Sequence, residues 1–153
     1  MTPVRTALAA LVVVAFGLAI AGAGMGSAPA GDPAPKSAQV AAAKQAVAAD
    51  ATAAEGAKEF ESEGCDACHA IAATGAKGKL GPRLDTDSDP VRETAGNITD
   101  PRTDIAEGYE GKLMPTDYAS RMSAEEIRAV ATFIHTASTA GGGSGGEGDG
   151  DGG

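Results

Sequence analysis

The sequence predicts an all-α fold, and three observations lead to that prediction. Ser123 and Glu126 form a capping box, which is typical of a helix N-terminus, before a segment at about residues 124–137. Four apolar residues in this segment recur at the i, i+3, i+4 and i+7 spacing of one helix face: Ile127, Val130, Ala131 and Ile134. No stretch of the sequence alternates apolar and polar residues as a strand would, and the sequence has no internal repeat.

A first core helix is predicted at about residues 53–63. Thr52 and Glu55 fit a capping box at its start. Gly56 and Phe60 are four residues apart and therefore share one face of this helix. Gly56 is either merely tolerated there or leaves room for a second helix to cross closely.

The middle of the chain is predicted to be mostly loop with two short helices. Residues 70–89 are rich in Gly, Lys and Asp, which favour loops. A helix is expected at 90–98, with Asp89 as its N-cap and Pro90 at its first position. A further short helix is expected at 103–109.

Composition divides the chain into four segments. Residues 1–30 have the plan of a targeting segment, and residues 31–53 are an Ala- and Pro-rich spacer, partly helical or disordered. The folding unit is expected at 54–138. Residues 139–153 are a Gly-rich acidic tail, expected to be flexible.

The targeting segment can act in two ways. Arg5 is its only charged side chain, and the uncharged stretch that follows is apolar at its centre, residues 11–20. This is typical of a secretory signal peptide, but about twenty uncharged residues also suffice to span a bilayer as an N-terminal membrane anchor. Either reading places the rest of the chain outside the cytoplasm, in the periplasm or at the outer face of the cytoplasmic membrane.

The net charge limits the partners. The chain has a formal charge of −9 at pH 7, which argues against nucleic-acid binding. An acidic surface suits basic redox partners, and it also favours solubility.

The motif Cys65-Asp66-Ala67-Cys68-His69 predicts the attachment of a covalent haem. Two thiols separated by two residues can add to the two vinyl groups of one porphyrin. His69 follows at once, so its imidazole can serve as an axial ligand of the iron.

Other uses of these cysteines fit less well. A structural zinc site needs about four ligands, whereas the chain has two cysteines and, besides His69, only His135. A thioredoxin-like pair needs a βαβ context, which the sequence lacks. A disulfide between Cys65 and Cys68 remains the alternative if no haem is attached, because the compartment is oxidising.

Three residues are candidates for the second axial ligand: Met114, Met122 and His135. Met114 is favoured, because it lies on a predicted loop that can place its sulfur without distorting a helix. Met122 is expected to pack in the core, and His135 is expected at the surface or rim.

The folding unit is small and poor in aromatic residues, since it has Phe60, Phe133, Tyr109, Tyr118 and no Trp. A covalently bound porphyrin would supply the missing apolar bulk. The haem-free chain is therefore expected to be unfolded or molten.

Taken together, these features resemble the class I cytochrome c family over about residues 54–138. The haem motif is followed by Gly81-Pro82-Arg83-Leu84, which resembles the family's Gly-Pro-x-Leu segment, and by the ligand loop at 112–115 and the C-terminal helix at 123–134. The resemblance implies that the carbonyl of Pro82 accepts the Nδ1 proton of His69. It also implies that the N- and C-terminal helices cross around the haem. Arg83 departs from the family pattern, and its role is open, with a haem propionate as one possible partner.

The function that follows is electron transfer by one covalent haem c, with His69 and Met114 as axial ligands. The chain would be a carrier or a membrane-tethered redox module, serving redox partner proteins of a respiratory or other electron-transfer chain. It would not be an enzyme. The alternative is a haem enzyme or sensor, which requires an open or labile sixth iron position.

Overall fold

The computed structural model describes residues 35–86, 88–111 and 114–142, and the predicted all-α fold is confirmed. Its α-helices are α1 Ser37–Ala49, α2 Ala51–Ser62, α3 Val91–Thr99, α4 Tyr118–Arg121 and α5 Ala124–Gly141. The signal or anchor expected at residues 1–30 lies outside the described residues, as does the tail from residue 143 onward. In the described ranges, no helix combines the length and apolarity that a membrane crossing requires.

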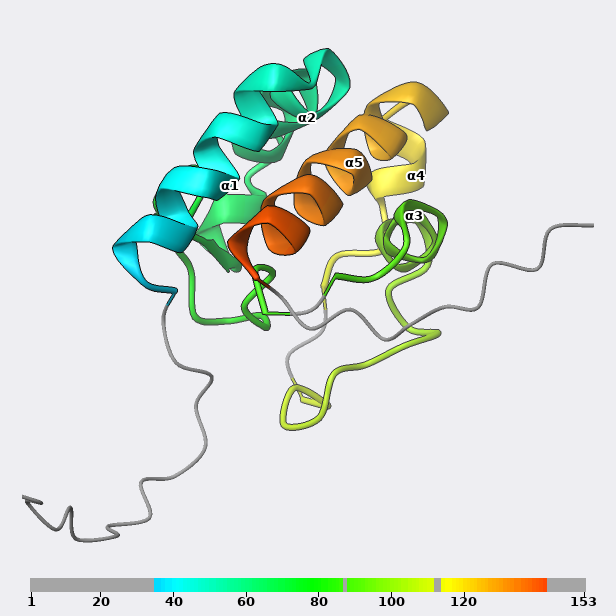
Figure 1. Cartoon of the computed structure of the whole chain (residues 1–153). Coiled ribbons are helices and arrows are strands. Elements are labelled where there is room, and N and C mark those ends of the chain that lie inside the picture. The colour runs from blue at the N-terminus through cyan, green and yellow to red at the C-terminus, as the bar shows by residue number, and fades with distance from the viewer. Residues whose placement is uncertain (1–34, 87, 112–113, 143–153) are drawn as a thin grey trace, which may run out of the picture. The chain divides into compact units, whose positions relative to one another are not determined.

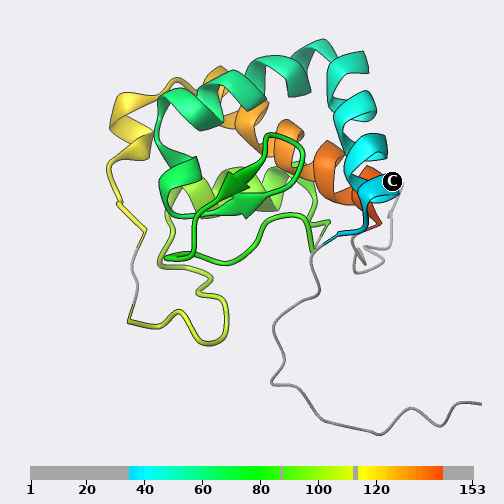
Figure 2. The ribbon, with the colours of Figure 1, turned by 90° about the vertical axis from the view of Figure 1, so that its left-hand side faces the viewer.

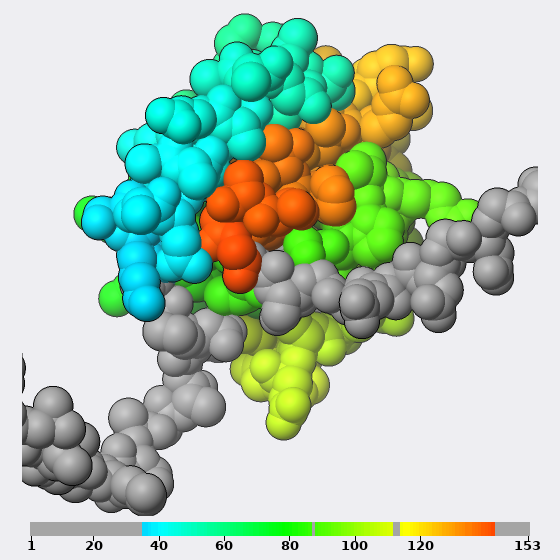
Figure 3. Space-filling model, viewed as in Figure 1, coloured from blue at the N-terminus to red at the C-terminus, as the bar shows by residue number. Residues whose placement is uncertain are grey.

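α5 forms the centre of the fold. It packs against α1 and α2 on one side and against α3 on the other (Figures 1 and 3). Its predicted apolar stripe is buried, and Ser123 and Glu126 make the predicted capping box. The helix is longer than expected, because it continues to Gly141, and Gly142 ends it in a left-handed conformation.

α2 and α5 cross closely at Gly56. A Cβ atom at this position would overlap the backbone carbonyl of Ala129 on α5. Beside this crossing, the rings of Phe60 and Phe133 are both buried and meet edge to face, with centroids 5.4 Å apart. Of the two readings of Gly56, the structure therefore supports close crossing by a second helix.

Replacing Gly56 with Ala should lower the free energy of unfolding of the haem-loaded protein by about 2–4 kcal/mol, because a backbone carbonyl cannot move aside as a side chain can. Denaturant unfolding measures this loss. The matched control is Gly96→Ala within α3, where an added Cβ meets nothing within 4 Å. That change should instead stabilise the protein by about 0.5–1 kcal/mol. Equal effects of the two substitutions would contradict the close crossing.

The start of α2 differs from the prediction. Thr52 does not cap the helix. Instead, the carboxylate of Asp50 accepts hydrogen bonds from the backbone N–H groups of Thr52 and Ala53, at 2.8 and 3.1 Å. An aspartate is as good an N-cap as a threonine or better, and the earlier start lets α2 follow α1 directly.

α1 occupies the range in which a spacer was expected. Ser37–Ala49 is helical and packs against α5, and Ala43 is buried in that contact. Its small Ala side chains leave a weak apolar pattern in the sequence, yet they allow a close approach between helices. This part of the range 31–53 is thus an ordered part of the fold.

The middle segment also differs from the prediction in two places. α3 begins one residue later than expected, with Pro90 as N-cap, and the side chain of Asp89 makes no capping bond. The backbone carbonyl of Asp89 instead accepts a hydrogen bond from Nδ1 of His135 at 2.9 Å. The helix expected at 103–109 is absent, and the chain forms turns there.

The predicted loop at 70–89 contains a small hairpin. β1 (Ala70–Ile71) and β2 (Ala76–Lys77) pair antiparallel (Figure 2). Gly75, with φ of +86°, makes the turn between them. Strands of two residues are too short to show an alternation of apolar and polar side chains in the sequence.

Candidate functional site

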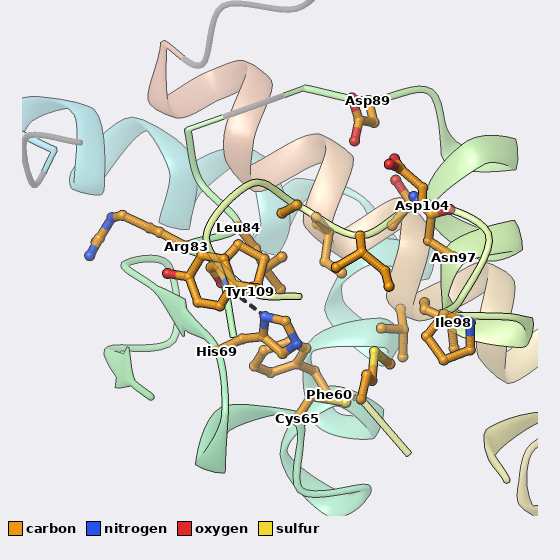
Figure 4. A pocket seen from close by; sticks show the side chains of 18 of the residues that line it. Phe60, Cys65, His69, Arg83, Leu84, Asp89, Asn97, Ile98, Asp104 and Tyr109 are labelled. Atoms are coloured by element: carbon orange, nitrogen blue, oxygen red, sulfur yellow. Dashed lines mark hydrogen bonds between the residues drawn. The ribbon is translucent and has the colours of Figure 1, made fainter. Parts of the chain in front are cut away.

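A cavity of about 480 Å³ lies at the side of α5 that faces the haem motif (Figure 4). This volume is in the range of sites that hold cofactors and other small molecules. Its lining is mainly apolar and includes Phe60, Leu84, Ile98, Met114, Val130 and Ile134. A second cavity, of about 240 Å³, shares four of the lining residues: Cys65, His69, Pro82 and Met114.

A single turn of 3-10 helix, η1 (Cys65–Ala67), brings the two cysteines together. Gly64 ends α2 in a left-handed conformation and redirects the chain into this turn. The N–H groups of Cys68 and His69 both donate to the carbonyl of Cys65, at 3.1 and 2.9 Å. The local backbone thus places Cys65 and His69 on the lining of both cavities, and Cys68 on the lining of the smaller one.

Cys65 and Cys68 are both free thiols, partly buried. Burial, with the nearby Glu63 carboxylate as a smaller cause, raises the pKa of Cys65 to about 11. At neutral pH this side chain is therefore a protonated thiol rather than a reactive thiolate.

The imidazole of His69 is held by a hydrogen bond that the family resemblance implied. Nδ1 donates to the carbonyl of Pro82 at 2.9 Å (Figure 4). Burial lowers the pKa of His69, and the Pro82 carbonyl opposes this shift. In the neutral ring with its proton on Nδ1, the Nε2 atom keeps a free electron pair. This tautomer is the one that can bind a metal through Nε2.

Two glycines bring the backbone against this histidine. A Cβ at Gly81 would lie 2.5 Å from Cε1 of the His69 ring, and a Cβ at Gly78 would overlap the backbone of Cys68. Only glycine allows these approaches. The sequence showed the Gly-Pro segment but gave no sign that Gly78 was restricted.

The three candidates for the second axial ligand lie in different parts of the fold. Met114 lines both cavities. Met122 is buried on the other side, where it lines a groove between α3 and α4, and His135 bonds to the Asp89 carbonyl. Lys112 and Leu113 of the expected ligand loop lie outside the described residues.

Arg83 has a protein partner. Its Nε lies 2.6 Å from Oδ1 of Asp85, and in Figure 4 the side chain extends away from the His69 ring. Asp85 is buried, and its Oδ2 accepts a hydrogen bond from the N–H of Ala72 at 2.7 Å. This carboxylate ties the hairpin to the segment that holds His69. Sequence reasoning missed it, because Asp85 is one of several aspartates in a loop-like stretch.

Asp85→Ala should cost about 2–3 kcal/mol of unfolding free energy in the haem-loaded protein, because it leaves the Ala72 N–H and the half-buried Arg83 without their partner. Chemical denaturation measures the loss. Glu61→Ala, which removes an exposed carboxylate from α2, is the control and should change stability by less than about 0.5 kcal/mol. A loss of similar size in both variants would show that Asp85 acts only through overall charge.

The residues around the cavities fit a covalent haem. Two thiols lie beside an imidazole whose Nε2 is unengaged, a thioether lies on the lining of the same cavities, and the remaining surface is mainly apolar. Among the described residues, no group of three or more His, Cys, Asp or Glu side chains could hold a metal ion.

Comparison with known proteins agrees with this chemistry. A protein-family model described as Cytochrome c matches residues 53–138, more than half of the chain. The comparisons with curated proteins and with solved structures gave no match.

Proposed function

Because this chain belongs to the cytochrome c family, we propose that it is a monohaem electron-transfer protein with His69 and Met114 as the axial ligands of its iron. Electron transfer by bound haem is the family's general role. Cys65 and Cys68 are proposed to hold the porphyrin through thioethers. One observation carries the proposal: Cys65, His69, Pro82 and Met114 line both cavities at the haem motif.

The residues of the chain explain how such a site would work. Haem supplies a one-electron couple between ferric and ferrous iron. Pro82 orients the His69 ring and increases the electron density on Nε2, as partners of ligating histidines generally do. The Met114 sulfur is a soft donor that favours ferrous iron and raises the reduction potential. With haem bound, the mainly apolar lining would exclude water from around the porphyrin.

The same arrangement supports an electron carrier over the alternative of a haem enzyme or sensor. An enzyme or sensor needs an open or labile position on the iron. Met114 lies on the cavity lining, where it can fill that position. We therefore propose that the protein transfers electrons and catalyses no reaction of its own.

An optical spectrum of protein produced with a haem-attachment system tests this proposal. Sharp α and β bands in the ferrous state and a weak far-red iron–sulfur band in the ferric state are expected. High-spin bands that shift with carbon monoxide would favour the enzyme or sensor. A colourless protein without a covalent mass addition would favour a Cys65–Cys68 disulfide.

We further propose that the protein works outside the cytoplasm, as a free carrier or tethered to the membrane, with redox proteins as partners. The uncharged apolar stretch near the N-terminus supports this location. Fractionation of producing cells, followed by N-terminal sequencing of the mature chain, tests it. A cleaved N-terminus indicates a carrier, an intact one in the membrane fraction indicates a tether, and recovery from the cytoplasm would contradict both.

A further inference from the structure

Arg121 of α4 joins two segments that lie far apart in the sequence. Its Nη1 donates to Oε2 of Glu63 at 2.7 Å, and its Nε lies 3.1 Å from Oδ2 of Asp117. The guanidinium also lies over the ring of Tyr118, 4.4 Å from the centroid. One side chain thus links the end of α2 to α4.

Both linked segments reach the proposed haem site. Glu63 precedes Cys65 by two residues. Tyr118 follows Met114 by four residues, and it lines the smaller cavity together with Cys65 and Met114. A link between Glu63 and α4 therefore connects the haem-attachment motif to the helix that follows the proposed ligand Met114.

α4 cannot hold this position by its own helical bonding. It has four residues, and its N-cap, Asp117, makes no side-chain capping bond. Helices shorter than about 12 residues are marginal in isolation. The place of α4 must then come from its tertiary contacts, which include its packing against α3, the buried Tyr118 and Met122, and the link through Arg121.

We propose that Arg121 is a positioning residue that holds α4, and with it Met114, at the proposed haem site, so that the thioether stays on the iron. This inference rests on the proposed His69/Met114 ligation. An arginine suits the position better than a lysine, since its planar fork can address Glu63 and Asp117 while it stacks on an aromatic ring. Loss of the link should let Met114 leave the iron more often without removing either ligand.

Imidazole binding to the ferric, haem-loaded protein tests the proposal, because imidazole must displace Met114. The far-red iron–sulfur band reports the displacement. Arg121→Gln should bind imidazole about fivefold more tightly than the parent protein, as expected for the loss of one partly exposed ion pair and one cation–π contact. The imidazole affinity of Arg121→Lys should lie between that of the parent protein and that of Arg121→Gln.

The control is Lys58→Gln, which breaks the exposed Lys58–Glu55 pair on α2, outside both cavities. It should leave imidazole affinity unchanged. Glu63→Gln removes the other half of the link and should tighten binding about twofold to fivefold. The double variant, with both Arg121→Gln and Glu63→Gln, should bind imidazole only slightly more tightly than Arg121→Gln alone, because both changes break the same link.

The outcomes distinguish a failure of this inference from a failure of the proposed His69/Met114 ligation. If the parent protein has the far-red band but Arg121→Gln and Glu63→Gln bind imidazole no better than Lys58→Gln, the positioning role is wrong and the ligation stands. A lowered melting temperature with unchanged imidazole affinity also overturns the role, since it indicates structural support alone. If the parent protein lacks the band, the ligation and this inference fail together. If Arg121→Gln does not fold, the imidazole affinity of Glu63→Gln tests the role instead, because that variant keeps the contacts of Arg121 with Asp117 and Tyr118.

Discussion

Without its haem, this chain should show no cooperative thermal unfolding. The cavity of about 480 Å³ beside α5 has a mainly apolar lining. An empty cavity of this size would cost on the order of 10 kcal/mol, which is comparable with the whole stability of a small domain, about 5–15 kcal/mol. Filling it with water would avoid the void but expose the apolar lining to solvent, so the loss would remain large.

The remaining core cannot offset this cost. Its largest fully buried side chains include Phe60, Phe133, Ile71 and Val130, and the Phe60–Phe133 pair is placed where α2 crosses α5. We therefore expect the haem-free chain to keep some helix while it loses fixed packing, as in a molten state.

The Cys65→Ala/Cys68→Ala double variant, purified without haem, provides the measurement. Far-ultraviolet circular dichroism should show partial helix, the near-ultraviolet signal should be lost, and calorimetry should show no heat-absorption peak. The control is the haem-loaded parent protein, which should melt cooperatively. A sharp calorimetric peak for the haem-free variant would contradict the prediction and show that the helices form a sufficient core alone.

The helices that the sequence predicted well are those whose signals are local. The Ser123 capping box and the apolar stripe of α5 lie within one continuous segment, and both are present in the structure. For α1, a partly helical spacer was predicted, but its packing against α5 was not. That contact uses Ala43 and Val47, and a pattern of large apolar residues does not reveal a contact made by such small side chains.

The residues of the site likewise fall into those that a local pattern predicted and those that it did not. Cys65, Cys68 and His69 are adjacent in the chain, so their spacing alone indicated their chemistry. Asp85 and Arg121 act through partners that the fold brings to them: the Ala72 N–H lies thirteen residues from Asp85, and Glu63 lies 58 residues from Arg121. No local pattern distinguishes either residue from a solvated charge.

Met114→Ala should change the iron chemistry strongly while the haem stays attached. The variant should lose the ferric far-red band, bind carbon monoxide in the ferrous state, and have a reduction potential lower by a few tenths of a volt. Axial ligands span roughly 0.8 V in haem proteins, and loss of the soft sulfur removes the donor that favours ferrous iron. The small alanine also leaves space on the cavity lining for an external ligand.

Met122→Ala is the matched control, because it removes a buried methionine of the same size from the side of the fold away from both cavities. It should cost about 2–4 kcal/mol of unfolding free energy through the void that it creates, yet it should keep the far-red band and the potential of the parent protein. Potentiometric titration and carbon monoxide binding of both variants decide the assignment. If Met122→Ala loses the band while Met114→Ala keeps it, the buried methionine must reach the iron, and the ligand loop has been assigned to the wrong residue. If neither variant changes the spectrum, the sulfur is not a ligand, and the sixth position must be open or filled by another group.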